Sequence, residues 1–458
     1  MPGVRRHWGW IGLAVGGLAA ASLALPSVPT TDAWGWILWG RELSGGELHT
    51  DVAGSPSWKP LPVAFTTLLS LLGDGAPEGW LFVARALGLL GLVLAYLVGA
   101  RLAGRWAGIV AAVTLALAGG WLRALEHGYS EPLVVTALLG ALLAYLHGRR
   151  QPAFWLAVAA SLARPELWPL TLGLALWLGR SEPRLRARAW AAVAAVPVLW
   201  VGVDWLGSGR FMNGSKTAAG VAKHLNGLDV LALGVPIPPL PALVLAAAAG
   251  ILAMVRRERL PGMLAGAVLV WAAGLAVGVA IGYPPTERLL FPLMAAVCVL
   301  AGVGATRLVA LGGSTAARAG LAAVLVALSL PAGVSRVGDL LSTARDAEQR
   351  ARLQLDLRKA ARMARAEAPG ARAVALPGDL IWLRGAVAWE WRLPLREVGA
   401  LGHPPPGPRL FAFVPRSRPY AGSHQLARTR SWRVLLEPRL ANTAGRPLRE
   451  TFAHAPRG

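Results

Sequence analysis

Two carboxylates and a set of basic side chains stand beside apolar segments of this sequence, where they could do chemistry. Asp32 follows the first apolar run, and Glu131 opens a later one. A carboxylate in such a place can take a proton from an attacking hydroxyl and act as a general base. Either acid could equally well cap the helix that begins beside it, so local sequence leaves both roles open.

The basic side chains suggest recognition of an anion. Arg85 lies about six residues inside an apolar run, where a charge needs a partner or an anionic ligand. Its guanidinium could hold a phosphate through two parallel hydrogen bonds, whereas the alternative is that the side chain snorkels to the membrane interface. Other candidate binding residues occupy the same kind of loop position: Trp58, Lys59, Arg123, Glu126, Arg164, Glu166 and Arg288. The sequence contains no His/Cys/Asp cluster at metal-ligand spacing and no phosphate-binding glycine loop, so no metal ligands are predicted.

The composition indicates that a membrane-embedded fold positions these residues. Of the 458 residues 55% are hydrophobic and only 15% are charged, against about 25% charged in a soluble domain. The hydrophobicity excludes intrinsic disorder, and the single cysteine, Cys298, excludes a disulfide scaffold. The net charge of +22 is carried mainly by arginines scattered through short loops, so we expect no nucleic-acid partner.

The apolar runs predict an all-α polytopic membrane protein with roughly eleven transmembrane helices. The runs lie at about 8–25, 79–100, 106–122, 131–147, 152–163, 165–179, 188–206, 238–255, 262–283, 289–306 and 319–334. The pair 152–163 and 165–179 could be two short helices or one helix broken at Arg164-Pro165. Fifteen basic residues fall in the very short loops of one side and eight in the longer loops of the other. This bias predicts that the N-terminus is cytoplasmic.

Two long loops, at about 27–78 and 207–237, are predicted to be external, and 61–72 within the first is predicted to lie at the membrane surface. We therefore divide the chain into a membrane domain, 1–335, and an external soluble domain, 336–458. The latter should be a small α/β unit, because 340–367 has helical spacing and 371–376, 409–414 and 432–437 resemble short strands. Acids and tryptophans concentrate in the external loops, which indicates either one external mouth or an interfacial belt.

Short motifs around these residues resemble the GT-C superfamily of integral-membrane glycosyltransferases. The similarity covers about residues 8–335 and lies in TDAWGWILWGRE around Asp32, SWKPLP at 57–62, GYSEP at 128–132, LARPE at 162–166 and ERLLFPLMAAVCVLAGVG at 287–304.

The resemblance implies an enzyme of the bacterial inner membrane, with its C-terminal domain periplasmic, that takes a sugar from a polyprenyl-phosphate carrier. The transfer to a glycan, lipid or protein acceptor would be inverting. Asp32 would be the base and Glu131 or Glu126 a second acid, while Arg85, Arg164 or Arg288 would stabilise the leaving phosphate. Asp32 is not part of an Asp-X-Asp pair, so a need for Mg²⁺ or Mn²⁺ stays open.

A transporter or flippase for a lipid-linked or small polar substrate is the main alternative, and a receptor or assembly scaffold is the third. A transporter would show repeat symmetry and helices broken near the bilayer midplane, and the sequence shows no repeat of useful length. A scaffold would leave the loop acids dispensable. Substituting Asp32 in a sugar-transfer assay separates these classes.

Overall fold

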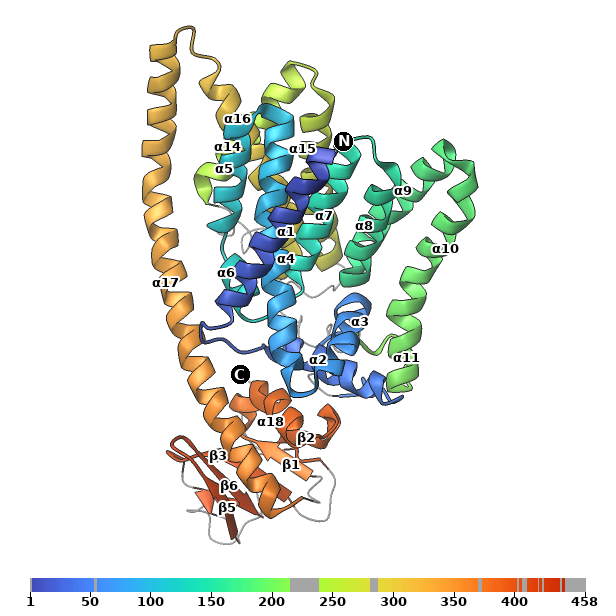
Figure 1. Cartoon of the computed structure of the whole chain (residues 1–458), viewed down its shortest axis with the longest axis vertical. Helices are drawn as coiled ribbons and strands as arrows, with labels where there is room; N and C mark the ends of the chain where they lie inside the picture. The colour runs from blue at the N-terminus through green and yellow to red at the C-terminus, as the bar shows by residue number, and fades with distance from the viewer. Residues whose placement is uncertain are drawn as a thin grey trace.

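The computed structural model describes residues 2–52, 56–214, 239–280, 287–369, 373–401, 403–405, 410–418, 420–421, 424–436 and 439–440. A bundle of helices forms the larger part, and a small α/β domain lies at one end of it (Figure 1). The expectation of a mostly helical protein with a small C-terminal sheet is confirmed. Most of the predicted loop 207–237 falls outside the described residues.

Most helices of the bundle follow the predicted apolar runs, but two of them, 31–44 and 60–69, lie within the predicted loop 27–78. They are α1 (Pro2–Ser22), α2 (Thr31–Ser44), α3 (Pro60–Leu69), α4 (Ala76–Ala103), α5 (Arg105–Ala116), α6 (Trp121–Glu126), α7 (Glu131–Leu146), α8 (Arg150–Ala163), α9 (Trp168–Ser181), α10 (Arg186–Pro197), α11 (Val203–Ser208), α14 (Leu240–Val255), α15 (Arg259–Ala280), α16 (Phe291–Val309) and α17 (Thr315–Glu367). A short 3₁₀ turn, Pro165–Leu167, separates α8 from α9. The region 152–179 therefore forms two short helices.

Five helical segments of the described chain are long and apolar enough to cross a membrane: Pro60–Ala103, Pro183–Ser208, Arg259–Ala280, Arg288–Val309 and Thr315–Glu367. Four shorter apolar helices, of 10–17 residues, accompany them: Trp8–Ser22, Arg105–Ala116, Glu131–Leu146 and Leu240–Val255. The expected number of about eleven spans stays a prediction. The burial of the apolar windows, 83% in Arg288–Val309 and 0% in Thr315–Glu367, shows that α16 is central and that the apolar half of α17 is peripheral.

Small residues let α16 occupy the centre of the bundle. A Cβ on Gly302 would lie 2.1 Å from the carbonyl oxygen of Ala107 in α5. A Cβ on Gly304 would lie 2.0 Å from the carbonyl oxygen of Leu245 in α14. Close approach of backbones at small residues is the usual way in which membrane helices gain packing contacts, because burial of apolar surface drives little association within lipid.

The C-terminal domain is joined to the bundle by one continuous helix. Helix α17 has 53 residues and passes through Pro331 without ending. Beyond it lie β1 (Ala373–Leu376), α18 (Arg384–Glu390), β2 (Val398–Ala400), β3 (Leu410–Pro415), β4 (Tyr420–Ala421), β5 (His424–Arg428), β6 (Trp432–Leu436) and β7 (Arg439–Leu440). The main sheet has the order β2-β1-β3-β6-β5, with β1 parallel to β2 and β3 and the remaining pairs antiparallel. Three of its strands, β1, β3 and β6, fall on the three segments predicted to be strands.

Helix α2 lies between the bundle and this domain, and α18 packs against it (Figure 1). The ring centroids of Trp34 and Trp389 are 6.2 Å apart, and the side chain of Arg41 donates to the backbone carbonyl of Leu393 at 2.6 Å. Trp36 is also fully buried. The tryptophans at 34–39, which the sequence left open as part of an interfacial belt, are therefore core residues. Trp389 of α18 packs on Trp34, and Trp80 and Trp58 pack on Trp36 and Trp39.

Candidate active site

Asp32 lies in the first turn of α2, and its carboxylate does not cap that helix. The capping residue is Thr30, whose hydroxyl accepts a hydrogen bond from the backbone N–H of Ala33 at 3.5 Å. The Oδ2 atom of Asp32 instead forms an ion pair with Arg288. Among the described residues its Oδ1 has no hydrogen-bond partner, and this atom is not buried. Thr30, and not Asp32, therefore caps α2, and one carboxylate oxygen of Asp32 is available to a ligand.

Arg288 is held by an acid and by an aromatic ring. It lies in the 3₁₀ turn Glu287–Leu290 that leads into α16. One Nη atom bonds Asp32, and the guanidinium carbon lies 5.1 Å from the centroid of the Tyr129 ring. Stacking on a ring leaves the N–H groups at the edge of the guanidinium free to donate. Arg288 therefore joins α2, the α6–α7 connection and α16 at one point.

Glu131 and Arg164 form a buried ion pair next to this point. Their side chains are 2.6 Å apart, with 0% of Glu131 and 7% of Arg164 exposed. Arg164 also lies 3.6 Å from Glu166. Its extended backbone, enforced by the following Pro165, ends α8 and turns the side chain toward the first residue of α7. Sequence motifs separated by more than thirty residues thus meet in one cluster.

Lys59 completes the cluster with a buried amine whose hydrogen-bond partner among the described residues is neutral. Its Nζ donates to the hydroxyl of Ser130 at 2.6 Å and lies 5.0 Å from the Trp36 ring centroid. Burial lowers its pKa from 10.5 to about 8, although the negative charge of Glu131 partly offsets this. Burying an ammonium group is costly unless an anion compensates it.

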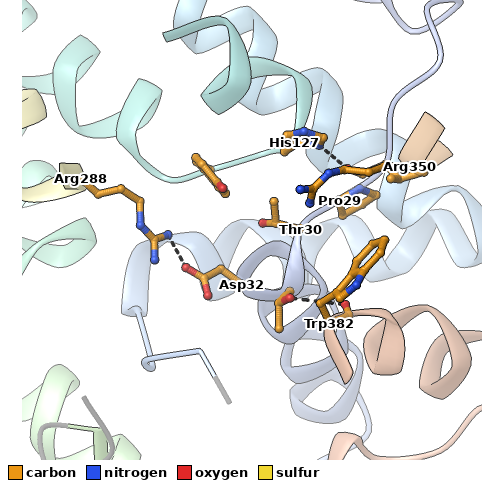
Figure 2. Close-up of a pocket in the computed structure, with 10 residues that line it drawn as sticks. Pro29, Thr30, Asp32, His127, Arg288, Arg350 and Trp382 are labelled. Atoms are coloured by element: carbon orange, nitrogen blue, oxygen red, sulfur yellow. Dashed lines mark hydrogen bonds and ion pairs between the residues drawn. The ribbon is translucent and has the colours of Figure 1, made fainter. Parts of the chain in front are cut away.

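A cavity of about 200 Å³ opens beside Asp32 (Figure 2). Its lining comes from the α1–α2 connection, the first turn of α2, the α6–α7 connection, the turn before α16, α17 and the C-terminal domain: Val28, Pro29, Thr30, Thr31, Asp32, His127, Tyr129, Arg288, Arg350 and Trp382. His127 contacts the backbone carbonyl of Val28 through Nδ1 at 3.1 Å, and burial lowers its pKa. Burial also raises the pKa of Tyr129, so both groups are neutral near pH 7.

The structure brings Asp32, Lys59, Glu131, Arg164 and Arg288 together, with Glu166 at the edge of the group. The other predicted binding residues lie elsewhere. Trp58 donates to the backbone carbonyl of Leu199 at 2.9 Å and packs on Trp39. Arg85 donates to the backbone of Ser22 and the hydroxyl of Ser27, tying α4 to the end of α1.

Arg123 is exposed, and Glu126 lies close enough to Arg85 and Arg123 to feel their charges. Burial raises the pKa of Glu126, and the two arginines oppose that shift. The substrate-binding roles predicted for Trp58, Arg85, Arg123 and Glu126 stay predictions.

Among the cavity residues that the sequence did not single out, Arg350 and Trp382 are the farthest from Asp32 in the chain. Both belong to the segment predicted to be a separate external domain, and nothing in their local sequence separates them from other arginines and tryptophans. Only the docking of that domain on α2 brings them to Asp32.

The donor set does not fit a divalent cation. Mg²⁺ and Mn²⁺ need several oxygen ligands. Within the described chain no three His, Cys, Asp or Glu side chains cluster, and Asp32 and Glu131 each bind an arginine. We therefore assign no step to a metal.

The arrangement of these helices is the GT-C glycosyltransferase fold, as the sequence resemblance led us to expect. ArnT from Cupriavidus metallidurans bound to undecaprenyl phosphate matches with a TM-score of 0.61 and 15% identity, over 94% of this chain and 98% of that one. The archaeal oligosaccharyltransferase AglB from Archaeoglobus fulgidus, in complex with an inhibitory peptide and a dolichol-phosphate, matches with a TM-score of 0.53 and 12% identity. That match covers 85% of this chain and 64% of AglB. No protein-family model and no curated sequence matches the chain.

Proposed function

We propose that this protein is a membrane glycosyltransferase that moves a sugar from a polyprenyl-phosphate carrier to an acceptor hydroxyl, with inversion at the anomeric carbon. The observation that carries the proposal is the placement of Asp32 at a cavity, with Arg288 on one of its oxygens. An acid and a cation side by side are what a displacement of phosphate by a hydroxyl needs. The fold shared with ArnT and AglB, whose structures hold undecaprenyl phosphate and dolichol-phosphate, supports the same reaction class.

The carrier phosphate would bind between Lys59 and Arg288. The ammonium of Lys59 has a serine hydroxyl as its hydrogen-bond partner, and Arg288 has edge N–H groups beyond those used by Asp32. An anion placed there would balance the buried positive charge of Lys59. Among the described residues, that charge is balanced only by the acids of neighbouring ion pairs. The apolar tail of the carrier would remain in the bilayer.

Asp32 would act as the general base. It takes the proton of the acceptor hydroxyl, the hydroxyl oxygen forms a bond to the anomeric carbon, and the bond from that carbon to the phosphate oxygen breaks. The electron pair leaves with the phosphate, whose growing charge Lys59 and Arg288 stabilise. A positioned general base contributes about 10²–10⁴-fold in rate.

The test uses membranes that contain the wild type or Asp32→Asn, supplied with undecaprenyl-phosphate carrying a radiolabelled hexose. We expect the variant to lose transfer by at least about 10²-fold while purified protein still binds undecaprenyl phosphate. A flippase would instead move the labelled lipid across vesicle membranes without forming a product, and that result would overturn the proposal. Near-normal product formation by Asp32→Asn would remove Asp32 from the reaction.

We place the site at the external face of a bacterial inner membrane. The support is the loop charge: basic residues are concentrated in the short loops opposite the C-terminal domain.

A further inference from the structure

The C-terminal domain provides one wall of the cavity next to Asp32 (Figure 2). Arg350 comes from α17, and Trp382 comes from the 3₁₀ turn Gly378–Leu383. The hydroxyl of Thr31 donates to the backbone carbonyl of Trp382 at 3.4 Å, which fixes this turn against the start of α2. Asp32 is the next residue in the chain, so this wall stands beside the proposed base.

Arg350 is oriented by an aromatic ring, and no acid of the described chain pairs with it. Its guanidinium carbon lies 5.4 Å from the centroid of the Trp382 ring. Stacking occupies the face of a guanidinium and leaves its edge donors free for a two-point contact with an anion. No carboxylate of the described chain lies within ion-pair distance of Arg350, whereas Arg336, Arg352, Arg358 and Arg362 of the same helix each pair with an acid.

The neighbouring charges make this part of the cavity positive. The charges of Arg350, Arg123 and Arg85 all disfavour protonation of His127. The acid that lines the cavity, Asp32, is already paired with Arg288. An anionic group would find complementary charge here, and a cation would not.

Arg288 lines the cavity, so the proposed phosphate position would be at one end of it, and Arg350 and Trp382 would be on the acceptor side. Lys59 and Glu131, on the proposed phosphate side, are not among its lining residues. In an inverting displacement the acceptor and the leaving phosphate stand on opposite faces of the anomeric carbon. The cavity volume is below the roughly 300–1,000 Å³ of pockets for drug-sized ligands, so it suits a single sugar ring next to Asp32.

We propose, building on the proposed function, that Arg350 binds a phosphate or carboxylate group on the acceptor, close to the hydroxyl that Asp32 deprotonates. Trp382 is a positioning residue that holds the guanidinium with its edge toward the cavity. The acceptor is then a sugar ring that bears an anionic substituent.

The test measures binding of glucose 6-phosphate, glucuronate and neutral methyl glucoside to purified full-length protein by calorimetry, with undecaprenyl phosphate present at saturation to fill the carrier site. We expect one or both anionic sugars to bind at least about ten-fold more tightly than methyl glucoside, the effect of a hydrogen bond to a charged group. Arg350→Gln should abolish that preference, and Arg350→Lys should keep part of it. Trp382→Ala should weaken the preference more than Trp382→Phe.

Arg345→Gln is the matched control, because Arg345 is an exposed arginine of the same helix that does not line the cavity. It should leave the preference intact. The inference is wrong if undecaprenyl phosphate binds but the wild type shows no preference, if Arg350→Gln retains it, or if Arg345→Gln loses it equally. If the preference for anionic sugars is seen only without undecaprenyl phosphate, their anionic group binds at the carrier site. That result would also overturn the inference. Failure of undecaprenyl phosphate to bind would instead contradict the proposed function.

Discussion

Asp32 and Arg288 form an ion pair although 256 residues separate them in the chain. One belongs to the first turn of α2 and the other to the turn that leads into α16. The pair therefore links the loop that carries the proposed base to the central helix of the bundle. Because Arg288 also stacks on Tyr129, the orientation of the carboxylate depends on three segments at once.

Activity should fall as pH rises above the pKa of Lys59. Burial lowers that pKa from 10.5 to about 8, so the ammonium that we assign to the carrier phosphate is lost above pH 8. The kcat/KM for the lipid donor, which reports free-enzyme pKa values, should fall up to about ten-fold per pH unit there. Lys59→Arg should extend the plateau to higher pH. A profile that is flat to pH 10 in the wild type would contradict the role.

The loss of activity above pH 8 can be distinguished from unfolding. The folded state releases the proton of Lys59 before the unfolded state does, so the unfolded state binds more protons between about pH 8 and 10.5. The contribution of Lys59 to the free energy of unfolding therefore rises with pH across that window. Thermal melting at each pH checks that the protein remains folded.

Glu131→Gln should destabilise the protein by about 3–5 kcal/mol, because it leaves the Arg164 guanidinium buried without its main acid. Replacing both partners, with Glu131→Gln and Arg164→Met, should cost less than the single change. Glu166→Gln is the control: its carboxylate lies farther from Arg164, at 3.6 Å, and the change should cost under about 1 kcal/mol. Thermal melting in detergent measures all three. Equal losses of stability for Glu131→Gln and Glu166→Gln would show that the buried Glu131–Arg164 pair contributes no more than the Arg164–Glu166 contact.

Arg85→Leu should lower stability and leave the KM for the donor unchanged. The side chain donates to Ser22 and Ser27, so its removal leaves half-buried acceptors unpaired at a cost of up to about 1–3 kcal/mol. Arg85→Lys should be intermediate. The sequence alone favoured a phosphate contact equally, and a ten-fold higher donor KM at unchanged melting temperature would establish that contact.

Gly385→Ala should impair transfer by displacing the C-terminal domain. A Cβ at this position would lie 2.3 Å from Cβ of Trp34, so α18 and α2 must separate. Overpacking of this kind costs about 1–3 kcal/mol, and displacement of a site by 1 Å can cost about 10²-fold in rate. Gly378→Ala is the matched control, since a Cβ there meets nothing within 4 Å. Equal activity of the two variants would show that domain docking does not support the site.

The topology predicts external labelling at two exposed positions. Gly45→Cys and His424→Cys should react with an impermeant thiol reagent on intact cells. The native cysteine, Cys298, is fully buried and should give no background. Labelling only after lysis would place the C-terminal domain and the proposed site in the cytoplasm.

Apolar runs and loop charge predicted most of the helices, because membrane insertion depends on local hydrophobicity that can be read residue by residue. The same reasoning placed Asp32, Lys59, Glu131 and Arg164 on one side of the bundle. It could not pair them, since partners such as Asp32 and Arg288 are chosen by helix packing between distant segments.

The C-terminal contribution to the cavity was missed for a related reason. Arg350 resembles every other arginine of a basic amphipathic helix until α18 docks on α2. Trp34 likewise looked interfacial, because nothing local shows that Trp389 of α18 packs on it.

The unbroken course of α17 makes the lipid bilayer part of the geometry of the cavity. From Pro331 to Arg350 the helix rises about 28 Å, at 1.5 Å per residue. Over that length a tilt of roughly 2° about Pro331 moves the guanidinium by about 1 Å, a shift that matters at an active site. Because the apolar window of α17 is 0% buried in the bundle, hydrophobic mismatch with the surrounding lipid would act on its tilt. A change in membrane thickness would then tilt α17 and move Arg350 relative to the cavity, with no ligand involved.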